Sequence, residues 1–251
     1  MATPTLSIIL PVLNEAAGIA SVLASLQALR AAGVELIVVD GGSTDDTARV
    51  ATALCDQLIS APRGRASQMN AGAAVAQADR LLFLHADTRL PQNAIAAIQT
   101  ALDTNIWGRF DVHIDGQHPM LKVVATMMNL RSRLTGIATG DQAIFVRRAA
   151  FDQIGGFADL PLMEDITLSR GLKALGRPAC LRQRGTTAGE NRLNVSTTVR
   201  MRSFGPVANW SWTKSMAHTS FEQDAAQRPS LSFAFTRRFG GLCRNCKPIS
   251  L

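Results

Sequence analysis

The chain has 251 residues, of which 47% are hydrophobic and 18% charged, so it can bury a large core and is not disordered throughout. Its apolar runs are all shorter than the roughly 18 residues that a membrane-spanning helix needs. No basic segment followed by an apolar run precedes Leu6, as a secretory signal would require. We therefore expect a soluble, cytoplasmic protein built on one large domain.

The net charge of +7 is unevenly distributed. Residues 184–251 contain ten Lys and Arg against three Asp and Glu, whereas the other 183 residues contain sixteen of each. The basic character therefore belongs to the C-terminal segment and says nothing against a neutral enzyme domain before it. Cys243 and Cys246 form a single CxxC in this segment, which without a second ligand pair is weak support for zinc.

The predicted elements alternate between strand and helix in the first half of the chain, which indicates a parallel sheet with right-handed crossovers. The spacing of apolar residues predicts strands at 6–12, 35–39, 58–60, 81–84, 110–114 and 142–146, and helices at 15–29, 47–54, 66–78, 91–102, 120–134, 151–156 and 165–175. The strand at 110–114 alternates as a half-exposed strand does. Periodicity is lost from Arg184 onward, so we expect a domain at 1–183 and an irregular basic tail at 184–251.

Polar residues follow the first two predicted strands directly. Asn14 and Glu15 come after the first, and the loop from Asp40 to Asp45 comes after the second. Glycines in that loop permit close backbone approach, and the following helix N-terminus favours anions, which suits a nucleotide. The alternative for Asn14 and Glu15 is an N-terminal cap. The loop has neither the G-x-G-x-x-G spacing of a dinucleotide fold nor the G-K-[ST] of a P-loop, which argues against a dehydrogenase or an NTPase.

Two further clusters fit a phosphate and a metal ion. Arg63 and Arg65 flank a glycine before a helix that carries Gln68 and Asn70, which suits bidentate phosphate recognition, with a solvated loop as the alternative. The buried strand 81–84 ends in His85-Ala86-Asp87, where a carboxylate could hold Mg²⁺ or Mn²⁺ against a diphosphate. The alternative for Asp87 is a carboxylate that caps the following turn.

Two acidic motifs follow in the second half. Asp141 lies in Gly-Asp-Gln at the start of a predicted strand, and Glu164 and Asp165 open a helix. Acids are common in a first helical turn because of the helix dipole, so the pair by itself has a structural explanation.

Together, these motifs occur in a fixed order across about 155 residues. The set resembles the family 2 glycosyltransferases of the GT-A fold, in particular the compact bacterial type associated with arsenosugar biosynthesis, over roughly residues 5–183. The resemblance implies a mixed, mainly parallel sheet flanked by helices in a Rossmann-like α/β arrangement. It also implies a nucleotide-diphosphate sugar donor such as a UDP-sugar, a divalent metal and inversion at the anomeric carbon.

The resemblance also implies roles for single residues. Asp165 would be the general base, with Glu164 beside it, and Asp87 would hold the metal. His85 stands where the family's D-x-D motif has its first Asp, so it is a candidate second ligand. The donor would be bound by Pro11, Asn14, Glu15, Asp40, Gly42, Arg63, Arg65, Asn70, Ala86 and Asp141.

The acceptor is expected to be a lipid-linked or small-molecule hydroxyl, selected by residues 110–134, and a lipid-linked one would suit peripheral contact with the inner membrane face. Two alternatives stay open. A nucleotidyltransferase would typically carry a Gly-rich, Lys-bearing loop near its N-terminus, which this chain lacks. A non-catalytic nucleotide-sugar- or nucleic-acid-binding protein could use the tail, where Trp210 and Trp212 lie among basic residues, although we do not favour nucleic acid. The tail is also hypothesised to be divergent or to derive from a shifted reading frame.

Overall fold

One eight-stranded sheet organises the protein, whose computed structural model describes residues 3–189. The strand order is β3-β2-β1-β4-β7-β6-β8-β5. The strands are β1 (Leu6–Val12), β2 (Val34–Asp40), β3 (Gln57–Ser60), β4 (Arg80–Phe83), β5 (Thr88–Arg89), β6 (Trp107–Asp115), β7 (Ile144–Arg147) and β8 (Ala179–Ala188).

The first four strands run parallel, with β1 between β2 and β4. The chain therefore turns from one side of β1 to the other between β3 and β4, and in such sheets ligands bind at the carboxyl ends of the strands beside this switch. Beyond β4 the pairing changes, because β7 is antiparallel to both β4 and β6. β8 then pairs parallel to β6, and the short β5 pairs antiparallel to β8.

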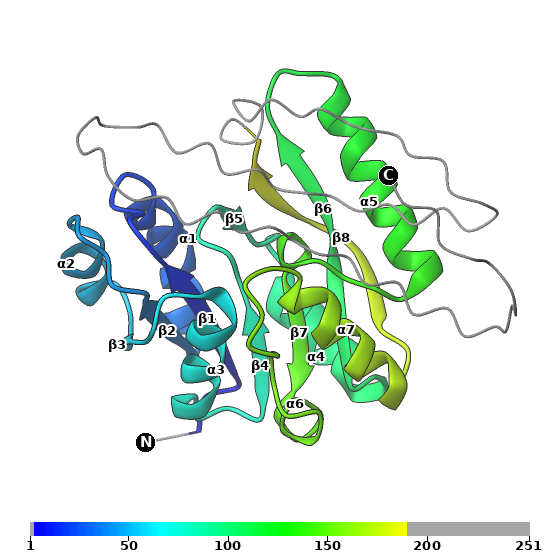
Figure 1. Ribbon diagram of the computed structural model, residues 1–251, viewed down its shortest axis with the longest axis horizontal. Coiled ribbons are helices and arrows are strands. Elements are labelled where there is room, and N and C mark those ends of the chain that lie inside the picture. Colours follow the sequence, from blue (N-terminus) through cyan, green and yellow to red (C-terminus); the bar gives the residue numbers. More distant parts are fainter. Residues whose placement is uncertain (1–2, 190–251) are drawn as a thin grey trace, which may run out of the picture. The chain divides into compact units, whose positions relative to one another are not determined.

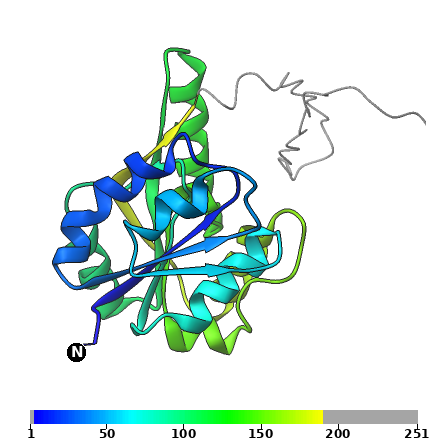
Figure 2. The same cartoon turned by 90° about the vertical axis from the view of Figure 1, so that its left-hand side faces the viewer.

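Helices cover both faces of the sheet, as Figures 1 and 2 show. Those that pack on one face are α1 (Ile19–Ala31), α2 (Thr47–Thr52) and α4 (Ala94–Thr104). Those on the other face are α3 (Arg65–Val75), α6 (Arg148–Gln153) and α7 (Glu164–Leu175). The sixteen-residue α5 (Met120–Thr135) packs on β6, far along the sheet from β2 and β3 (Figure 1).

The apolar strand sequences explain this layering. All seven residues of β1 and of β2 are buried, and alternate side chains enter opposite cores. Ile8 and Leu10 pack with α1, whereas Ile9 packs with α3. Gly72 of α3 permits the close approach, because a Cβ there would overlap the side chain of Ile9. A strand buried on both faces reads as a continuous apolar run, which is why the sequence marks β1 and β2 clearly.

The helix expected at 15–29 begins at Ile19 instead. The amide of Glu15 donates to Thr47 Oγ1 at 2.7 Å, and the amide of Ala16 donates to Asp45 Oδ2 at 3.2 Å. These side chains lie in the loop after β2 and at the start of α2, so a tertiary contact holds the chain in a turn where local spacing predicts helix.

The expectation of a half-exposed strand at 110–114 is wrong, because β6 is buried along most of its length. Its polar residues Arg109 and Asp111 lie under α5, where they bind each other. The strand expected at 142–146 begins at Ile144, because residues 140–142 form a turn of 3₁₀ helix. β5 and β8 were not predicted.

β8 crosses the expected domain boundary, since residues 184–188 continue the strand that begins at Ala179. Three successive residues of β8, Arg182 to Arg184, are exposed, which explains a polar strand without a clear apolar pattern. The tail beyond residue 189, with its CxxC and its two Trp residues, lies outside the described residues, and the boundary stays a prediction. Within residues 3–189, no helix combines the length and the apolar character that crossing a bilayer requires.

Candidate functional site

A turn after β4 presents the predicted metal ligands. The strand ends at Phe83, and the amide of Thr88 donates to the carbonyl of His85 at 3.0 Å, which closes the turn. The amide of Ala188 in β8 donates to the carbonyl of Asp87 at 3.1 Å and anchors the turn from the other side. The Asp87 carboxylate is thereby presented at the carboxyl end of a central strand, on an exposed residue.

Asp141 joins these two residues from a distant part of the sequence. Candidate ligand atoms of His85, Asp87 and Asp141 all lie within 4.8 Å of one another. His85 Nδ1 is 3.4 Å from Asp141 Oδ1, and the two side chains are only 12% and 17% exposed. The resemblance pointed to Asp141 as a donor-binding residue, and its position beside the two candidate metal ligands was not predicted.

The turn that carries Asp141 fits tightly against His85. The amide of Thr139 donates to Gln142 Oε1 at 3.2 Å, and the amide of Gln142 donates to the carbonyl of Thr139 at 2.9 Å, which holds the single 3₁₀ turn in place. Gly140 lies against the imidazole, and a Cβ there would overlap Cε1 and Nε2 of His85. Only glycine allows this approach, so Gly140 determines how close Asp141 comes to His85.

The chemistry of the three side chains fits a divalent cation. Two carboxylates supply the hard oxygen ligands that Mg²⁺ and Mn²⁺ prefer, and the imidazole nitrogen adds a ligand that transition metals accept. Three protein ligands leave coordination positions for the oxygens of a diphosphate. The cluster can therefore bind a metal ion and a phosphorylated ligand together.

Asp165 is coupled to the same turn. Its Oδ2 accepts a hydrogen bond from the amide of Gly140 at 2.8 Å, and its Oδ1 accepts one from the amide of Ile166 at 2.7 Å. Each carboxylate oxygen has a second lone pair, so Asp165 can still accept a proton while these amides fix its orientation. The predicted base and the predicted metal ligands thus meet through Gly140.

Glu164 differs from its neighbour because it is buried, with 4% of its surface exposed. Among residues 3–189 its carboxylate has no hydrogen bond or ion pair. It lies in the first turn of α7, where the helix dipole favours a negative charge. The Asp165 carboxylate is therefore held in a fixed orientation by two amides, whereas the Glu164 carboxylate is buried.

The loops after β1 and β2 bind each other. The Asp40 carboxylate, which is 7% exposed, accepts from the amides of Gly42 and Ser43 at 3.2 and 3.1 Å. The amide of Asn14 donates to Ser43 Oγ at 2.9 Å, and Asn14 Oδ1 accepts from the amide of Thr44 at 2.8 Å. Asp40 and Asn14 thus shape one rigid rim, with Pro11 buried in β1 behind it.

Asp45 completes this rim. The hydroxyl of Thr47 donates to Asp45, and this hydrogen bond is the main reason that the pKa of the Asp45 carboxyl lies below its usual value. The backbone amides of Thr47 and Ala16 donate to the same carboxylate and act in the same direction. Asp45 therefore links the loop after β2 to the turn that precedes α1.

Gln68, which the sequence placed with Asn70 in the phosphate cluster, instead supports the rim from below. Its side-chain amide donates to the carbonyls of Val12 and Val39, at 2.9 and 2.8 Å, where β1 and β2 end. It is 4% exposed and lies directly under Gly41. The only signal in the sequence for this role was an amide side chain among the small residues of the helix predicted at 66–78.

Asn70 does not face the rim. Its side-chain amide donates to the carbonyl of Phe157 at 2.8 Å, and its Oδ1 accepts from the amide of Phe157 at 2.9 Å. Gly156, with a φ of 75°, permits this pairing, because a Cβ there would lie 2.7 Å from Asn70 Oδ1. Asn70 thus connects α3 to the loop of residues 155–157. Arg63 and Arg65 are both exposed in and just after the loop that leads into α3.

A second polar network lies under α5 and was also missed. The Asp111 carboxylate binds Arg109, which is fully buried, and accepts from Arg133 of α5 at 2.7 Å. Asn129 of α5 pairs with the backbone of Val112 through both its side-chain amide and its oxygen. Gln142 Nε2 lies 3.4 Å from Asn129 Oδ1, so the network reaches the turn that carries Asp141.

Backbone strain marks the same motifs. Within residues 3–189, the non-glycine residues with positive φ are Asn14 at 53°, Ala143 at 46° and Met163 at 66°. Each adjoins or belongs to one of the predicted motifs: Asn-Glu, Gly-Asp-Gln and Glu-Asp. Such conformations cost about 1–3 kcal/mol each and concentrate at functional sites. Their positions therefore support these motifs independently of the side chains.

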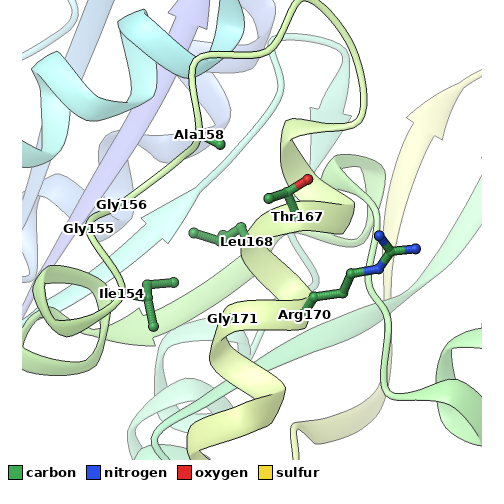
Figure 3. A pocket seen from close by; sticks show the side chains of 8 residues that line it. All are labelled: Ile154, Gly155, Gly156, Ala158, Thr167, Leu168, Arg170 and Gly171. Carbon is green, nitrogen blue, oxygen red and sulfur yellow. The ribbon is translucent and has the colours of Figure 1, made fainter.

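A hollow outside this cluster lies between the loop after α6 and the outer side of α7 (Figure 3). It is lined by Ile154, Gly155, Gly156, Ala158, Thr167, Leu168, Arg170 and Gly171. None of the predicted ligands or bases is among these residues, so we do not assign the hollow to the same site.

The chain is similar to known proteins in both sequence and fold. The model of the family described as glycosyl transferase family 2 matches residues 7–155. A PGL/p-HBAD biosynthesis glycosyltransferase of Mycobacterium bovis is 40% identical over 97 residues, which is 36% of this chain and 38% of that protein. An uncharacterized glycosyltransferase of the same species is 34% identical over 104 residues, 41% of this chain and 46% of that protein. This chain thus matches less than half the length of either relative.

Solved structures share the fold at low sequence identity. S. aureus TarS in complex with UDP-GlcNAc gives a TM-score of 0.60 at 18% identity, over 74% of this chain and 58% of that one. Glucosyl-3-phosphoglycerate synthase from Mycobacterium tuberculosis, with Mn²⁺, UDP and glucosyl-3-phosphoglycerate, gives 0.58 at 21% identity, over 76% and 75%. The mannosyltransferase PcManGT from Pyrobaculum calidifontis, with GDP-Man and Mn²⁺, gives 0.59 at 20% identity, over 75% and 57%. These likenesses confirm the predicted GT-A fold.

Proposed function

The chain belongs to the family 2 glycosyltransferases, and from this premise we propose that it transfers a sugar from a nucleotide diphosphate to a hydroxyl acceptor. The observation that carries the proposal is the meeting of His85, Asp87 and Asp141 with Asp165 around Gly140. Four side chains that the sequence spreads over 80 residues form one site at the carboxyl end of β4.

The nucleotide would bind at the rim formed after β1 and β2. Asp40 and Asn14 hold this rim rigid, and Glu15 lies exposed beside them. Two structural neighbours hold UDP-GlcNAc and GDP-Man, which supports a sugar nucleotide as ligand and, for this chain, a UDP-sugar as the donor to test first. Arg63 and Arg65, which are exposed before and at the start of α3, would approach the phosphates, with Ala86 and Gly42 allowing close contact.

His85, Asp87 and Asp141 would hold Mn²⁺ or Mg²⁺. When bound, the ion would neutralise the charge that develops on the departing diphosphate. The structural neighbours with Mn²⁺ support this assignment. The three side chains are close enough to share one ion, and Gly140 keeps Asp141 near His85.

Asp165 would act as the general base. The acceptor hydroxyl attacks the anomeric carbon from the face opposite the diphosphate, and Asp165 takes its proton as the new bond forms. This displacement inverts the configuration of the sugar. The hydrogen bond from Gly140 to Asp165 fixes the base relative to the metal ligands. Glu164 would stay buried behind it.

The test is UDP release from a panel of UDP-sugars in the presence of Mn²⁺ or Mg²⁺. Asp87→Ala and Asp141→Asn should abolish metal-dependent release and weaken Mn²⁺ binding measured by calorimetry. Asp152→Asn is the matched control, because Asp152 is an exposed carboxylate on α6 that belongs to neither cluster. Binding of UDP without turnover of any sugar nucleotide would favour the non-catalytic alternative, and failure of all these ligands to bind would overturn the proposal.

A further inference from the structure

Helix α5 has two apolar faces, of which one packs against the rest of residues 3–189. Its inner face contacts β6, where Leu121 and Ala125 join Val112 and Ile114 in a small buried cluster. Its outer face exposes five large apolar side chains, which we call the α5 stripe: Met120 (52% exposed), Val123 (51%), Met127 (51%), Leu130 (48%) and Leu134 (77%). A helix that uses one face for its fold has no structural need for the other.

The stripe is a continuous line rather than a scatter. Its residues follow one another at intervals of three and four, which places them along a single side of the helix. They make up five of the ten large apolar side chains that are exposed within residues 3–189. Single exposed apolar residues are normal on a protein surface, but a contiguous line of them marks an interaction surface.

The charge of α5 indicates which partner fits. The helix carries Lys122, Arg131 and Arg133 and contains no Asp or Glu. Arg133 binds Asp111 in the network under the helix, and Lys122 is exposed to solvent. Two guanidinium nitrogens of Arg131 are buried, so Lys122 is the basic side chain of α5 that remains for a contact along the stripe. A second copy packed there would offer Lys122 no acid from its own α5. An anionic surface has the complementary charge.

A lipid bilayer supplies both requirements. Helices that lie in the plane of a membrane combine an apolar side with Lys and Arg at its flanks, and they bind anionic lipids. Sixteen residues of helix extend over about 24 Å, which allows the whole stripe to lie along the surface. Figure 2 shows the beginning of α5, in green, projecting beyond the other helices, so the sheet does not obstruct such an approach.

The position of the stripe connects it to the site. α5 ends at Thr135, and the turn with Asp141 follows after four intervening residues, 136–139. Asn129, on the same helix, lies near Gln142 in that turn. A bilayer seated on α5 would therefore present its headgroups close to the metal ligands.

We propose that the α5 stripe seats the protein on an anionic phospholipid bilayer and brings lipid-borne hydroxyl acceptors to the site. The choice of acceptor rests on the proposed function, whereas the membrane contact itself does not. The surface thus defined lies on α5, within the folded domain, and not in the basic C-terminal tail.

The test is co-sedimentation of the full chain with vesicles of phosphatidylcholine, with and without phosphatidylglycerol. We compare the wild type with Met127→Glu/Leu130→Glu in the stripe. The matched control is Val75→Glu/Leu175→Glu, which adds the same charge at two other exposed apolar residues, 38% and 39% exposed, on α3 and α7. We expect the wild type to bind the anionic vesicles and the stripe variant to bind at least about tenfold more weakly. The control variant should bind as the wild type does.

Added salt distinguishes vesicle binding by the apolar α5 stripe from purely electrostatic vesicle binding by the C-terminal tail. At about 0.5 M NaCl the wild type should keep more of its binding than the stripe variant, because burial of apolar side chains is not screened. UDP release by the wild type, measured without vesicles, tests the proposed function alone, so a failure of membrane binding is distinct from a failure of the proposed function.

Any of four results would overturn the inference. The first is no binding of the wild type to anionic vesicles, and the second is equal binding of the wild type and the stripe variant. The third is a dimer, by light scattering, that the stripe variant converts to a monomer, because the stripe would then contact a second copy. Faster proteolysis of residues 190–251 in the stripe variant, without loss of vesicle binding, would likewise assign the stripe to the chain's own C-terminal segment.

Discussion

The two halves of the sheet position their polar side chains in different ways. In residues 6–83, the polar groups at the strand ends bind backbone amides of the same or the next loop, as Asp40 does with Ser43 and Asn14 with Thr44. In residues 107–188, Asp165 likewise binds a backbone amide, that of Gly140, but here a charged pair, Arg109 and Asp111, is also buried under α5. Both halves therefore use contacts between distant segments, and the second differs because it also buries charged side chains.

This contrast predicts that changes in the second half affect chemistry and folding most. Asp165→Asn should lower kcat for sugar transfer by roughly 10²–10⁴-fold, the usual contribution of a general base. The Asn side chain can still accept the hydrogen bond from Gly140, so Mn²⁺ affinity should be unchanged in calorimetry. Equal loss of kcat and of Mn²⁺ affinity would mean that Asp165 acts by positioning the turn that carries Asp141, and not as a base.

The buried network under α5 should dominate stability. Asp111→Asn leaves the guanidiniums of Arg109 and Arg133 without their carboxylate, and Arg109 is fully buried. We expect a loss of about 3–5 kcal/mol in the free energy of unfolding, measured in urea. The comparison is Asp46→Asn, which removes an exposed pair with Arg49, and it should change little. Similar losses in both variants would remove the distinction between the two halves.

A smaller effect, on Mn²⁺ affinity, is expected at the contact between His85 and the turn that carries Asp141. Gly140→Ala adds a Cβ that overlaps the imidazole, so His85 and Asp141 must move apart. Mn²⁺ affinity should fall by about 10–100-fold, as it does when the support of a metal ligand is lost. Gly18→Ala is the control, since a Cβ at Gly18 meets nothing within 4 Å. Unchanged Mn²⁺ affinity in Gly140→Ala would show that this packing does not position the ligands.

The smallest effect on stability should come from a change at Asp45, in the rim formed by the loops after β1 and β2. The pKa of Asp45 is lowered from 3.8, chiefly by the hydroxyl of Thr47, so its charged form stabilises the folded state above that pH. The stability difference between the wild type and Asp45→Asn should therefore be constant near neutral pH and disappear as the pH falls below 3.8 through the lowered folded-state value. Thermal unfolding at a series of pH values measures it.

Salt should distinguish Asp45 from its neighbour. The pKa of Asp46 is also lowered, but chiefly by Arg49, through a hydrogen bond and the attraction between opposite charges. Salt screens the charge of an exposed pair and affects a hydroxyl hydrogen bond much less. The effect of Asp46→Asn should therefore shrink with added salt while that of Asp45→Asn persists. Equal salt dependence would mean that charge, and not the Thr47 hydrogen bond, accounts for the shift at Asp45.

The sequence by itself determined the parallel half of the fold and the motifs of the site. β1 and β2 are buried on both faces, so their apolar runs identify them without knowledge of their neighbours. Polar residues directly after such strands must lie at one edge of the sheet, which is why the loops after β1, β2 and β4 could be named as site elements.

Only the tertiary structure decided how the second half is assembled. β6 has the alternating pattern of a half-exposed strand because Arg109 and Asp111 neutralise each other under α5, and an alternating pattern cannot reveal a buried ion pair. Asp141 reaches His85 because Gly140 has no side chain and because β7 runs antiparallel to β4. The sequence supplied the chemical groups, and long-range packing, which local spacing does not encode, decided which of them meet.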